Sequence, residues 1–335
     1  MAPETIRDVA KKAGVGVGTV SRVLNNSPAV TKETKQRVLD AIEELDYTPN
    51  PIAKQLSLGR THSFAVTLPF LTYPSFVERL RGVQHAMAES EYDLILFSAE
   101  TPKYRDNHFE LLTRKTRTDG ILVISIPLKE KHVDQFLSSG IPVVLVDVFH
   151  PKLNRVFVND IDGGYIATKH LIELGHTKIG FLSDHLDKQM KYLSMRNRYS
   201  GYKRAMQESD IPIIPEYQVF GNHGRNEASM LANQLFSLPD PPTAIFATSD
   251  TQAIGVLDAA KKMGLEVPGD VSVMGYDGIR DSEFVNLTTV AQPLFESGFE
   301  GAKMLISIID SPNGKVREIK LPLKLIVRGT TASPR

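Results

Sequence analysis

Basic side chains are concentrated near the start of the chain. Between residues 5 and 37, seven basic residues stand against two acidic ones, although the 335-residue chain has 39 Lys and Arg, 39 Asp and Glu, and so no net charge. Lysine and arginine neutralise the phosphates of nucleic acids. A solvated helix surface has the same composition, so charge alone leaves DNA binding as one of two interpretations of this region.

A second group of polar residues directly follows apolar runs that have the composition of β-strands. The group consists of Asp147, Ser183, Asp184, Ser249, Asp250 and Asp277. Ligands of open parallel sheets bind beyond the carboxyl ends of the strands, and a cleft between two lobes collects such ends. We therefore expect a cleft for a small polar molecule. For Asp250, capping of the following helix is an equally good interpretation.

Other chemistries are disfavoured by the residue types. The chain has no cysteine, which excludes thiol nucleophiles and Cys-ligated metals, and its nine histidines are scattered. Gly14, Gly16 and Gly18 resemble a dinucleotide loop, but Thr19 stands where the third glycine is required, and a helix pattern precedes them. No P-loop, G-x-S-x-G or H-E-x-x-H sequence occurs. We expect no enzyme activity, no cofactor and no metal.

The first residues and the lengths of the apolar runs indicate the cellular compartment. No stretch reaches 18 apolar residues, so no membrane span is expected. The first residues are charged and lack the apolar segment of a secretory signal. These features predict a cytoplasmic protein that does not contact a membrane.

The first 60 residues have the pattern of three short helices. Ile6, Val9, Ala10 and Ala13 form one helix face behind Thr5, and Gly14 ends that helix. A second helix is expected over 17–24, and a third begins after Thr31 and runs to about residue 45. Two short helices joined by a glycine-containing turn, followed by a third, are typical of a helix-turn-helix unit.

The rest of the chain alternates between apolar β-rich runs and amphipathic helical stretches. Eight strands are expected, at 64–68, 93–97, 120–125, 142–147, 178–183, 244–249, 271–277 and 323–327. Continuous apolar strands in βα units predict parallel sheets that are covered on both faces. The number of strands suggests two lobes.

The run TIRDVAKKAGVGVGTVSRVLNNSPAVTKETKQRVLDAIEELDYTPNPIAKQL resembles the headpiece of the lactose/galactose repressor family of bacterial transcription regulators. The resemblance extends over nearly the whole chain. It implies an all-α helix-turn-helix headpiece at 1–49, a hinge helix at 50–60, and a two-lobed α/β periplasmic-binding-protein-like effector domain at 61–335. The chain would cross three times between one lobe at about 61–160 and 290–320 and another at about 161–289 and 321–330.

The resemblance also implies which residues contact DNA. Residues 17–24 would be the recognition helix in the major groove, where helix side chains read base edges. Base readout falls on Val17, Gly18 and Arg22. Phosphate contacts, which position the protein, fall on Thr5, Thr19, Ser21, Asn25 and Thr34. For Thr19, Ser21 and Asn25, ordinary capping and solvation is the alternative.

The hinge segment matches the family less closely. The implied minor-groove residues are Asn50, Ala53, Lys54, Gln55 and Leu56. Leu56 stands where the family has a leucine wedge that bends DNA; packing on the regulatory domain is the alternative. Lys54 and Gln55 depart from the commoner family residues. A helix this short does not persist alone, so we expect it to form when two copies pair on DNA.

For the effector cleft, the resemblance singles out Asp277 in GYD, Arg198 in R-x-x-G-Y, and Asp147. Ser249 departs from the family's frequent Asn, and a structural salt bridge is the alternative for Arg198 and Asp277. His223 stands where the family often has an aromatic that stacks on the ligand, and Tyr73, Phe76 and Phe149 could supply an apolar floor. For these four residues a core or surface role is an equally good interpretation. The expected effector-binding residues are Tyr73, Phe76, Asp147, Arg198, His223, Ser249, Asp250 and Asp277.

These features together predict a transcriptional regulator, most simply a repressor. It would bind a pseudo-palindromic double-stranded operator as a homodimer, and a small effector in the cleft, a sugar or a nucleobase-like metabolite, would control its DNA affinity. A cytosolic sugar-binding receptor without a DNA role is the alternative, and a sugar-metabolising enzyme is a more distant one.

Overall fold

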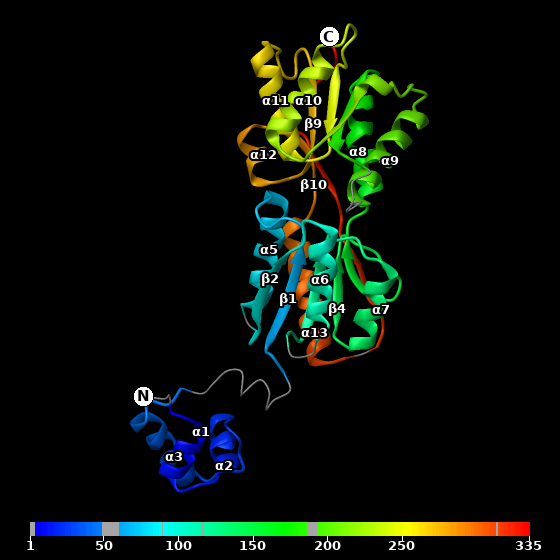
Figure 1. The fold of residues 1–335 in the computed structure, drawn as a ribbon. Helices are drawn as coiled ribbons and strands as arrows, with labels where there is room; N and C mark the ends of the chain where they lie inside the picture. The colour runs from blue at the N-terminus through cyan, green and yellow to red at the C-terminus, as the bar shows by residue number, and fades with distance from the viewer. Residues whose placement is uncertain (1–3, 49–59, 89, 115–116, 187–192, 313) are drawn as a thin grey trace. The chain divides into compact units, whose positions relative to one another are not determined.

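The computed structural model describes residues 4–48, 60–88, 90–114, 117–186, 193–312 and 314–335. The chain divides into two compact units, residues 1–61 and 62–335, which are coloured from blue to red along the chain in Figure 1. The predicted hinge residues Asn50, Ala53, Lys54, Gln55 and Leu56 lie outside the described residues.

The N-terminal unit contains the three predicted helices, α1 (Ile6–Ala13), α2 (Val17–Leu24) and α3 (Lys32–Glu44). Local signals set their ends. The Thr5 backbone N–H donates to the Asp8 carboxylate at 2.9 Å, and Gly14 ends α1 with a φ of 64°. The Thr34 backbone N–H donates to Thr31 Oγ1 at 3.3 Å at the start of α3. The apolar faces meet in a small core that includes Val9, Val20, Val23, Val38 and Ala41.

The first lobe of the larger unit is built on a sheet with strand order β11-β5-β4-β3-β1-β2, and all its pairs are parallel. Helices α5 and α13 lie over one face, and α6 and α7 lie over the other (Figure 1). The strands are β1 (Ser63–Leu68), β2 (Asp93–Ser98), β3 (Gly120–Ile124), β4 (Val143–Val146), β5 (Asn154–Phe157) and β11 (Glu318–Lys320). The helices are α5 (Pro74–Met87), α6 (Pro102–Leu112), α7 (Glu130–Ser139) and α13 (Leu294–Asp310).

The second lobe repeats this plan with strand order β12-β10-β9-β8-β6-β7. Only β12 runs antiparallel to its described neighbour. Its strands are β6 (Ile179–Asp184), β7 (Gln218–Gly221), β8 (Ala244–Ala247), β9 (Ser272–Asp277), β10 (Thr288–Ala291) and β12 (Lys324–Ile326). Its helices are α8 (Asp160–Glu173), α9 (Leu193–Glu208), α10 (Arg225–Phe236), α11 (Asp250–Met263) and the short α12 (Arg280–Phe284), with a 3₁₀ turn at Pro215–Tyr217.

The chain crosses between the lobes three times, after β5, after β10 and after β11. All eight predicted strands are present. The structure adds β5, β7, β10 and β11, which are three or four residues long. Because β10 still belongs to the second sheet, the second crossing comes after Ala291 rather than at about residue 290. The second lobe also continues past residue 330, since Ala332 bonds Ser272.

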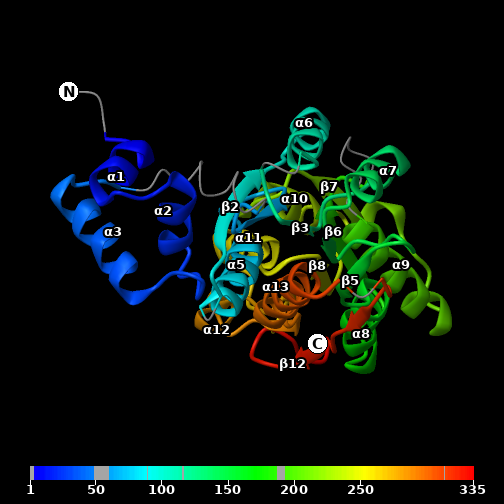
Figure 2. The same ribbon diagram turned by 90° about the horizontal axis from the view of Figure 1, so that it is seen from below.

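Glycines set the closest helix contacts in both lobes. A Cβ atom on Gly164 in α8 would lie 2.1 Å from the carbonyl oxygen of Arg198 in α9, and one on Gly298 in α13 would lie 1.9 Å from that of Arg79 in α5. The pairs α8 with α9 and α5 with α13 run side by side in both views (Figure 2). The glycines therefore determine how close the backbones of Arg79 and Arg198 come to their partner helices.

Replacing Gly164 by alanine should destabilise the larger unit by about 3 kcal/mol, the upper end of the usual cost of overpacking, because the clash is with backbone. Gly18→Ala is the matched control, since it is a helical glycine whose added Cβ would meet nothing within 4 Å. Urea unfolding followed by circular dichroism measures both. Equal midpoints for Gly164→Ala and the wild type would contradict the close-contact role.

A buried histidine joins the C-terminal segment to the second lobe. His176 Nδ1 lies 2.9 Å from Thr243 Oγ1, and its Nε2 lies 2.8 Å from the Ala332 carbonyl oxygen. Burial lowers the pKa of His176; the hydrogen bond to Ala332 only partly offsets this, and the neighbouring His170 lowers the pKa further.

This histidine should make stability depend on pH. The pKa of His176 is lower in the folded than in the unfolded state. Below about pH 6.5 the unfolded chain therefore binds a proton that the folded chain does not, and the protein loses stability as the pH is lowered. We expect the melting temperature to drop between pH 8 and pH 5.5, and to drop less in His176→Gln. Parallel melting curves of the two proteins over this range would refute the assignment.

Candidate DNA-binding surface and effector site

The N-terminal unit presents the predicted base-reading positions to solvent. Val17 is 41% exposed, and Gly18 and Arg22 are exposed on α2. The N-cap of α2 is Gly16, which offers no side-chain cap, so no side chain of the cap covers the first turn of this helix. The surface of α2 is therefore open to a partner at its first two turns.

Three of the predicted phosphate-contacting residues lie on α2 or at its end, and the other two lie at the starts of α1 and α3. Thr5 and Asn25 are exposed, and Thr19, Ser21 and Thr34 are half-buried. Two of them already have partners in the chain. Thr5 Oγ1 donates to the Asp8 carboxylate at 2.5 Å, and Thr34 Oγ1 accepts from Thr31 Oγ1 at 2.9 Å. Their hydroxyl groups contribute to capping in the free chain.

A cavity lies between the lobes of the larger unit, where the strands of both sheets end. It encloses about 620 Å³ of atom-free space, part of which is open to solvent. Of the eight residues predicted for the effector site, seven line it: Tyr73, Phe76, Asp147, Arg198, His223, Ser249 and Asp277.

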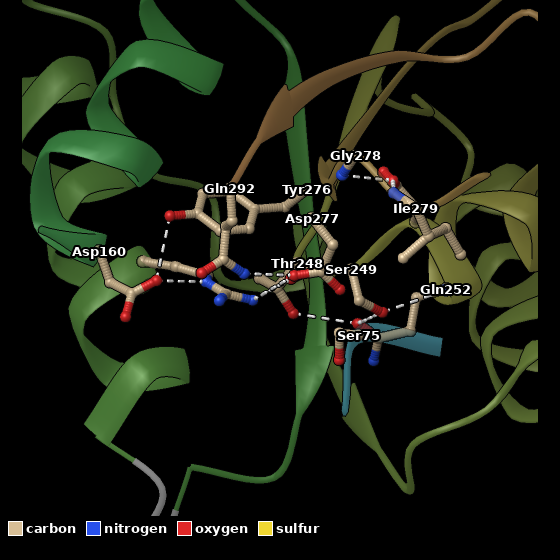
Figure 3. A network of polar contacts seen from close by, with 12 residues as sticks. Ser75, Asp160, Thr248, Ser249, Gln252, Tyr276, Asp277, Gly278, Ile279 and Gln292 are labelled. Carbon is tan, nitrogen blue, oxygen red and sulfur yellow. Dashed lines mark hydrogen bonds and ion pairs between the residues drawn. The ribbon is translucent and has the colours of Figure 1, made fainter. Parts of the chain in front are cut away.

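Asp250 does not line the cavity, and its placement there is corrected. Its carboxylate is fully buried and accepts from the backbone N–H groups of Gly278 at 2.7 Å and Ile279 at 2.9 Å and from Thr289 Oγ1 at 2.6 Å. Burial raises the pKa of Asp250 to about 8. Figure 3 shows Gly278 and Ile279 directly after Asp277. Asp250 therefore holds the turn that carries Asp277.

The second lobe places one guanidinium among carboxylates. Arg198 Nε donates to Asp160 Oδ1 at 2.8 Å, and its Nη1 donates to the Thr248 carbonyl at 2.6 Å and lies 3.7 Å from Asp277 Oδ1. The guanidinium lies 3.8 Å from the centre of the Tyr276 ring, whose hydroxyl donates to Asp160 Oδ1 at 3.0 Å (Figure 3). Burial opposes the charge of Arg198, but Asp160 and the other neighbours outweigh it and raise its pKa.

The first lobe contributes a second buried ion pair. Arg79 Nη2 donates to Asp147 Oδ2 at 2.6 Å and to Gln292 Oε1 at 3.3 Å. Gln292 Nε2 donates to Asp277 Oδ1 at 2.6 Å (Figure 3). Gln292 therefore connects the charges of the two lobes at the second crossing. Asp147 and Asp277 both have positive φ angles, 57° and 121°, and such strain is common at ligand sites.

Two buried polar atoms in this group have no hydrogen-bond partner in the described part of the chain, Asp147 Oδ1 and Arg79 Nε. A buried polar group without a partner costs free energy, and both residues line the cavity. One acceptor and one donor among the lining residues are therefore without a partner in the described part of the chain.

Aromatic rings connect the two sides of the cavity. Tyr73 of the first lobe stacks on His223 of the second, with ring centres 4.6 Å apart, and Phe70 stacks on Tyr73 at 4.3 Å. His223 Nδ1 lies 3.2 Å from Asp184 Oδ1, which also accepts from Gln252 Nε2 at 2.8 Å. Burial alone would lower the pKa of His223, but the Asp184 carboxylate raises it.

Sequence reasoning missed Arg79, Asp160 and Gln292 as members of this site. Arg79 lies in the middle of an amphipathic helix, where a charged residue ordinarily faces solvent. Gln292 follows β10, which was not expected as a strand. Asp160 follows the short strand β5, which was not expected either. If β5 had been recognised from the sequence, an acidic residue just after it would have indicated the site.

Among the described residues, no group of three or more His, Asp or Glu side chains could hold a metal ion. No helix in the described part of the chain is long and apolar enough to cross a membrane.

Family models match both parts of the chain. Residues 5–50 match the model described as bacterial regulatory proteins, lacI family, and residues 168–331 match a periplasmic binding protein-like domain. The HTH-type transcriptional repressor PurR of Mannheimia succiniciproducens is 35% identical over 330 residues, which cover 97% of each chain. PurR of Haemophilus influenzae strain PittEE is 35% identical, with 98% of this chain and 99% of that protein covered.

Solved structures agree with these matches. A lac repressor dimer bound to operator and the anti-inducer ONPF has 26% identity and a TM-score of 0.84, covering 98% of this chain and 99% of that one. A complex of the transcriptional regulator CelR with cellobiose has 27% identity and a TM-score of 0.71, with the same coverage. The fold predicted for both parts of the chain, headpiece and two-lobed body, is confirmed.

Proposed function

The chain belongs to the lacI family of bacterial regulatory proteins, and from this premise we propose that it is a DNA-binding repressor whose operator affinity is set by a small polar effector held between the two lobes. Its relatives are transcriptional repressors rather than enzymes. The observation that carries the effector proposal is the interlobe cavity with its unpaired Asp147 Oδ1 and Arg79 Nε.

The DNA-binding proposal assigns base readout to Val17, Gly18 and Arg22. Arg22 is the one long donor among them, and arginine grips guanine through two hydrogen bonds. Val17 can pack on a thymine methyl group. Thr5, Thr19, Ser21, Asn25 and Thr34 position the helix on phosphates. The hinge assignments of Asn50, Ala53, Lys54, Gln55 and Leu56 are proposals from the family resemblance alone.

The effector is a sugar or a nucleobase-like metabolite. Asp147, Arg198 and Asp277 would bind its polar edge, and Tyr73, Phe76 and His223 would lie against its ring. The name of the PurR relatives states no ligand, and the CelR structure is a complex with cellobiose. Neither decides between a sugar and a nucleobase-like effector for this chain. Binding would change the lobe orientation, because contacts in the cavity join the two lobes. Tyr73 of the first lobe stacks on His223 of the second, and Gln292 bonds both Arg79 of the first lobe and Asp277 of the second.

We also propose that the protein acts in the cytoplasm as a homodimer. Large apolar side chains are exposed on the edge strand β2, at Ile95 and Leu96, and on α12, where Phe284 is 82% exposed. Exposed apolar side chains on an edge strand favour an interface with a second copy. A two-fold dimer would match the two-fold symmetry of a pseudo-palindromic operator.

Asp277→Asn should abolish the effect of the effector on DNA affinity and leave the DNA affinity of the free protein within about threefold. Asparagine keeps the size of the side chain and tolerates positive φ, so the turn after β9 should survive, but the acceptor charge beside Arg198 is removed. Allosteric coupling is typically about 1–3 kcal/mol, which corresponds to a 5- to 150-fold change in operator affinity.

The measurement is fluorescence anisotropy of labelled operator DNA, with an effector first identified by a thermal-shift screen of sugars and nucleobases. Asp270→Asn is the matched control, since Asp270 lies in the second lobe outside the cavity. An unchanged response in Asp277→Asn would refute the proposed effector site.

A further inference from the structure

A second cavity adjoins the first on the side where the chain first crosses between the lobes. It encloses about 690 Å³ of atom-free space, partly open to solvent. Asp147, Asp160 and Ser194 line both cavities. The two cavities therefore share part of their lining at these three residues.

An aromatic platform lies in the second cavity. Phe149 lines it and is 52% exposed. The guanidinium of Arg155 lies between Phe149 and Phe157, 4.3 and 3.9 Å from the two ring centres. Arg155 is held in turn by Glu318, with Nε donating at 2.8 Å and Nη2 at 3.2 Å. The ring of Phe149 is thus supported on one side and exposed to the cavity.

Polar groups stand beside this platform without partners. Ser194 and Asn197 are one helical turn apart on α9 and both line the second cavity. Within the described residues, neither side chain makes a hydrogen bond. Asp147 Oδ1, at the junction, is also unpaired. These groups offer donors and acceptors around an apolar ring face, which is the chemistry that binds a hydroxyl-bearing ring.

The charges argue against an anionic ligand here. Arg155 is the only cation that lines the second cavity in the described part of the chain, and Glu318 already occupies its guanidinium. The other charged groups at the junction are the carboxylates Asp147 and Asp160. A phosphate would face these carboxylates without a free cation.

We propose that the effector has two rings, with the first in the cleft and a second, uncharged and hydroxyl-bearing ring on Phe149, as in a disaccharide or a nucleoside. This inference rests on the proposed function. Asp147 would bind at the junction of the two rings, and Ser194 and Asn197 would bind hydroxyl groups of the second.

Because the chain has no cysteine, Asn197→Cys creates a unique thiol in the second cavity. The probes are two matched pairs, glucose with cellobiose and adenine with adenosine, which separate the sugar from the nucleoside source. Thermal shifts of the wild type and of Asp277→Asn first establish which compounds bind in the cleft. The rate of alkylation by iodoacetamide is then measured by mass spectrometry, with Ser200→Cys, exposed on the same helix, as the control.

At saturation, the two-ring compound of the pair that binds should slow alkylation of Asn197→Cys at least tenfold. The one-ring compound of the same pair should slow it less than twofold. Neither compound should change the alkylation rate of Ser200→Cys. Phe149→Ala should weaken the two-ring compound about tenfold and leave the one-ring compound unchanged. Tyr104→Ala, an exposed aromatic outside both cavities, should alter neither affinity.

The outcomes separate this inference from the proposed function. If a two-ring compound binds and requires Asp277 but leaves alkylation unchanged, the second-ring site is wrong while the effector cleft stands. If one-ring and two-ring compounds protect equally, the second-ring site is again wrong. If no compound of either pair stabilises the wild type, the proposed effector class fails and the inference fails with it.

Discussion

Arg198→Ala should lower the free energy of unfolding of the larger unit by about 3–5 kcal/mol, the usual result of removing one partner of a buried ion pair. Arg198 is almost fully buried, and it donates to Asp160 and to the Thr248 carbonyl. Its loss leaves the Asp160 carboxylate buried without its partner and removes the cation that lies 3.7 Å from Asp277. Urea unfolding at pH 7, followed by circular dichroism, measures the change.

Arg225→Ala is the matched control. Arg225 pairs with Asp258 through two contacts, but its side chain is more than half exposed, and exposed pairs contribute about 0–1 kcal/mol. Adding Asp160→Asn to Arg198→Ala should restore part of the lost stability, because one of the uncompensated charges is then gone. A loss as small as that of the control would mean that Arg198 has no structural role.

Arg22→Ala should remove most of the preference for operator over unrelated DNA, at about 1–3 kcal/mol per half-site. The exposed guanidinium on α2 is the group in this unit best suited to a guanine edge, since Val17 and Gly18 have no donors on their side chains. A symmetric dimer would lose the contact twice. Anisotropy titrations with a selected operator and a scrambled sequence of equal length measure the ratio of affinities.

Arg37→Ala serves as its control, because Arg37 is an exposed basic residue on α3 rather than α2. Loss of a basic residue outside the recognition helix should weaken binding to both DNA sequences alike and reduce the salt dependence. If Arg22→Ala does the same and keeps the wild-type ratio, α2 is not the recognition helix.

Local signals were sufficient for much of the fold. Thr5, Gly14 and Thr31 determine helix ends within a few residues of themselves, and long apolar strands are evident from their composition. The strands β5, β7, β10 and β11 escaped prediction because each is at most four residues long and carries polar residues. Their position is fixed by pairing with neighbouring strands rather than by their own composition.

The site was predictable only where a residue stands at a strand end or in a family motif. Asp147, Arg198 and Asp277 met that condition. Arg79 did not, since it reaches Asp147 and Gln292 across 68 and 213 residues of chain. Asp250 also follows a strand, but its carboxylate accepts from backbone N–H groups of the loop after β9 and does not line the cavity. Which way a side chain turns at a strand end depends on tertiary contacts.

The three crossings have a consequence for synthesis of the protein. Five strands of the first sheet, β1 to β5, are made early. The face that carries Phe64, Val66, Leu122 and Val144 is covered in part by α13, which follows the whole second lobe up to β10. At ribosomal rates of about 5–20 residues per second, that apolar face waits on the order of ten seconds for its cover. We expect the nascent first lobe to expose this face, and so to be prone to aggregation, until Leu294–Asp310 has emerged.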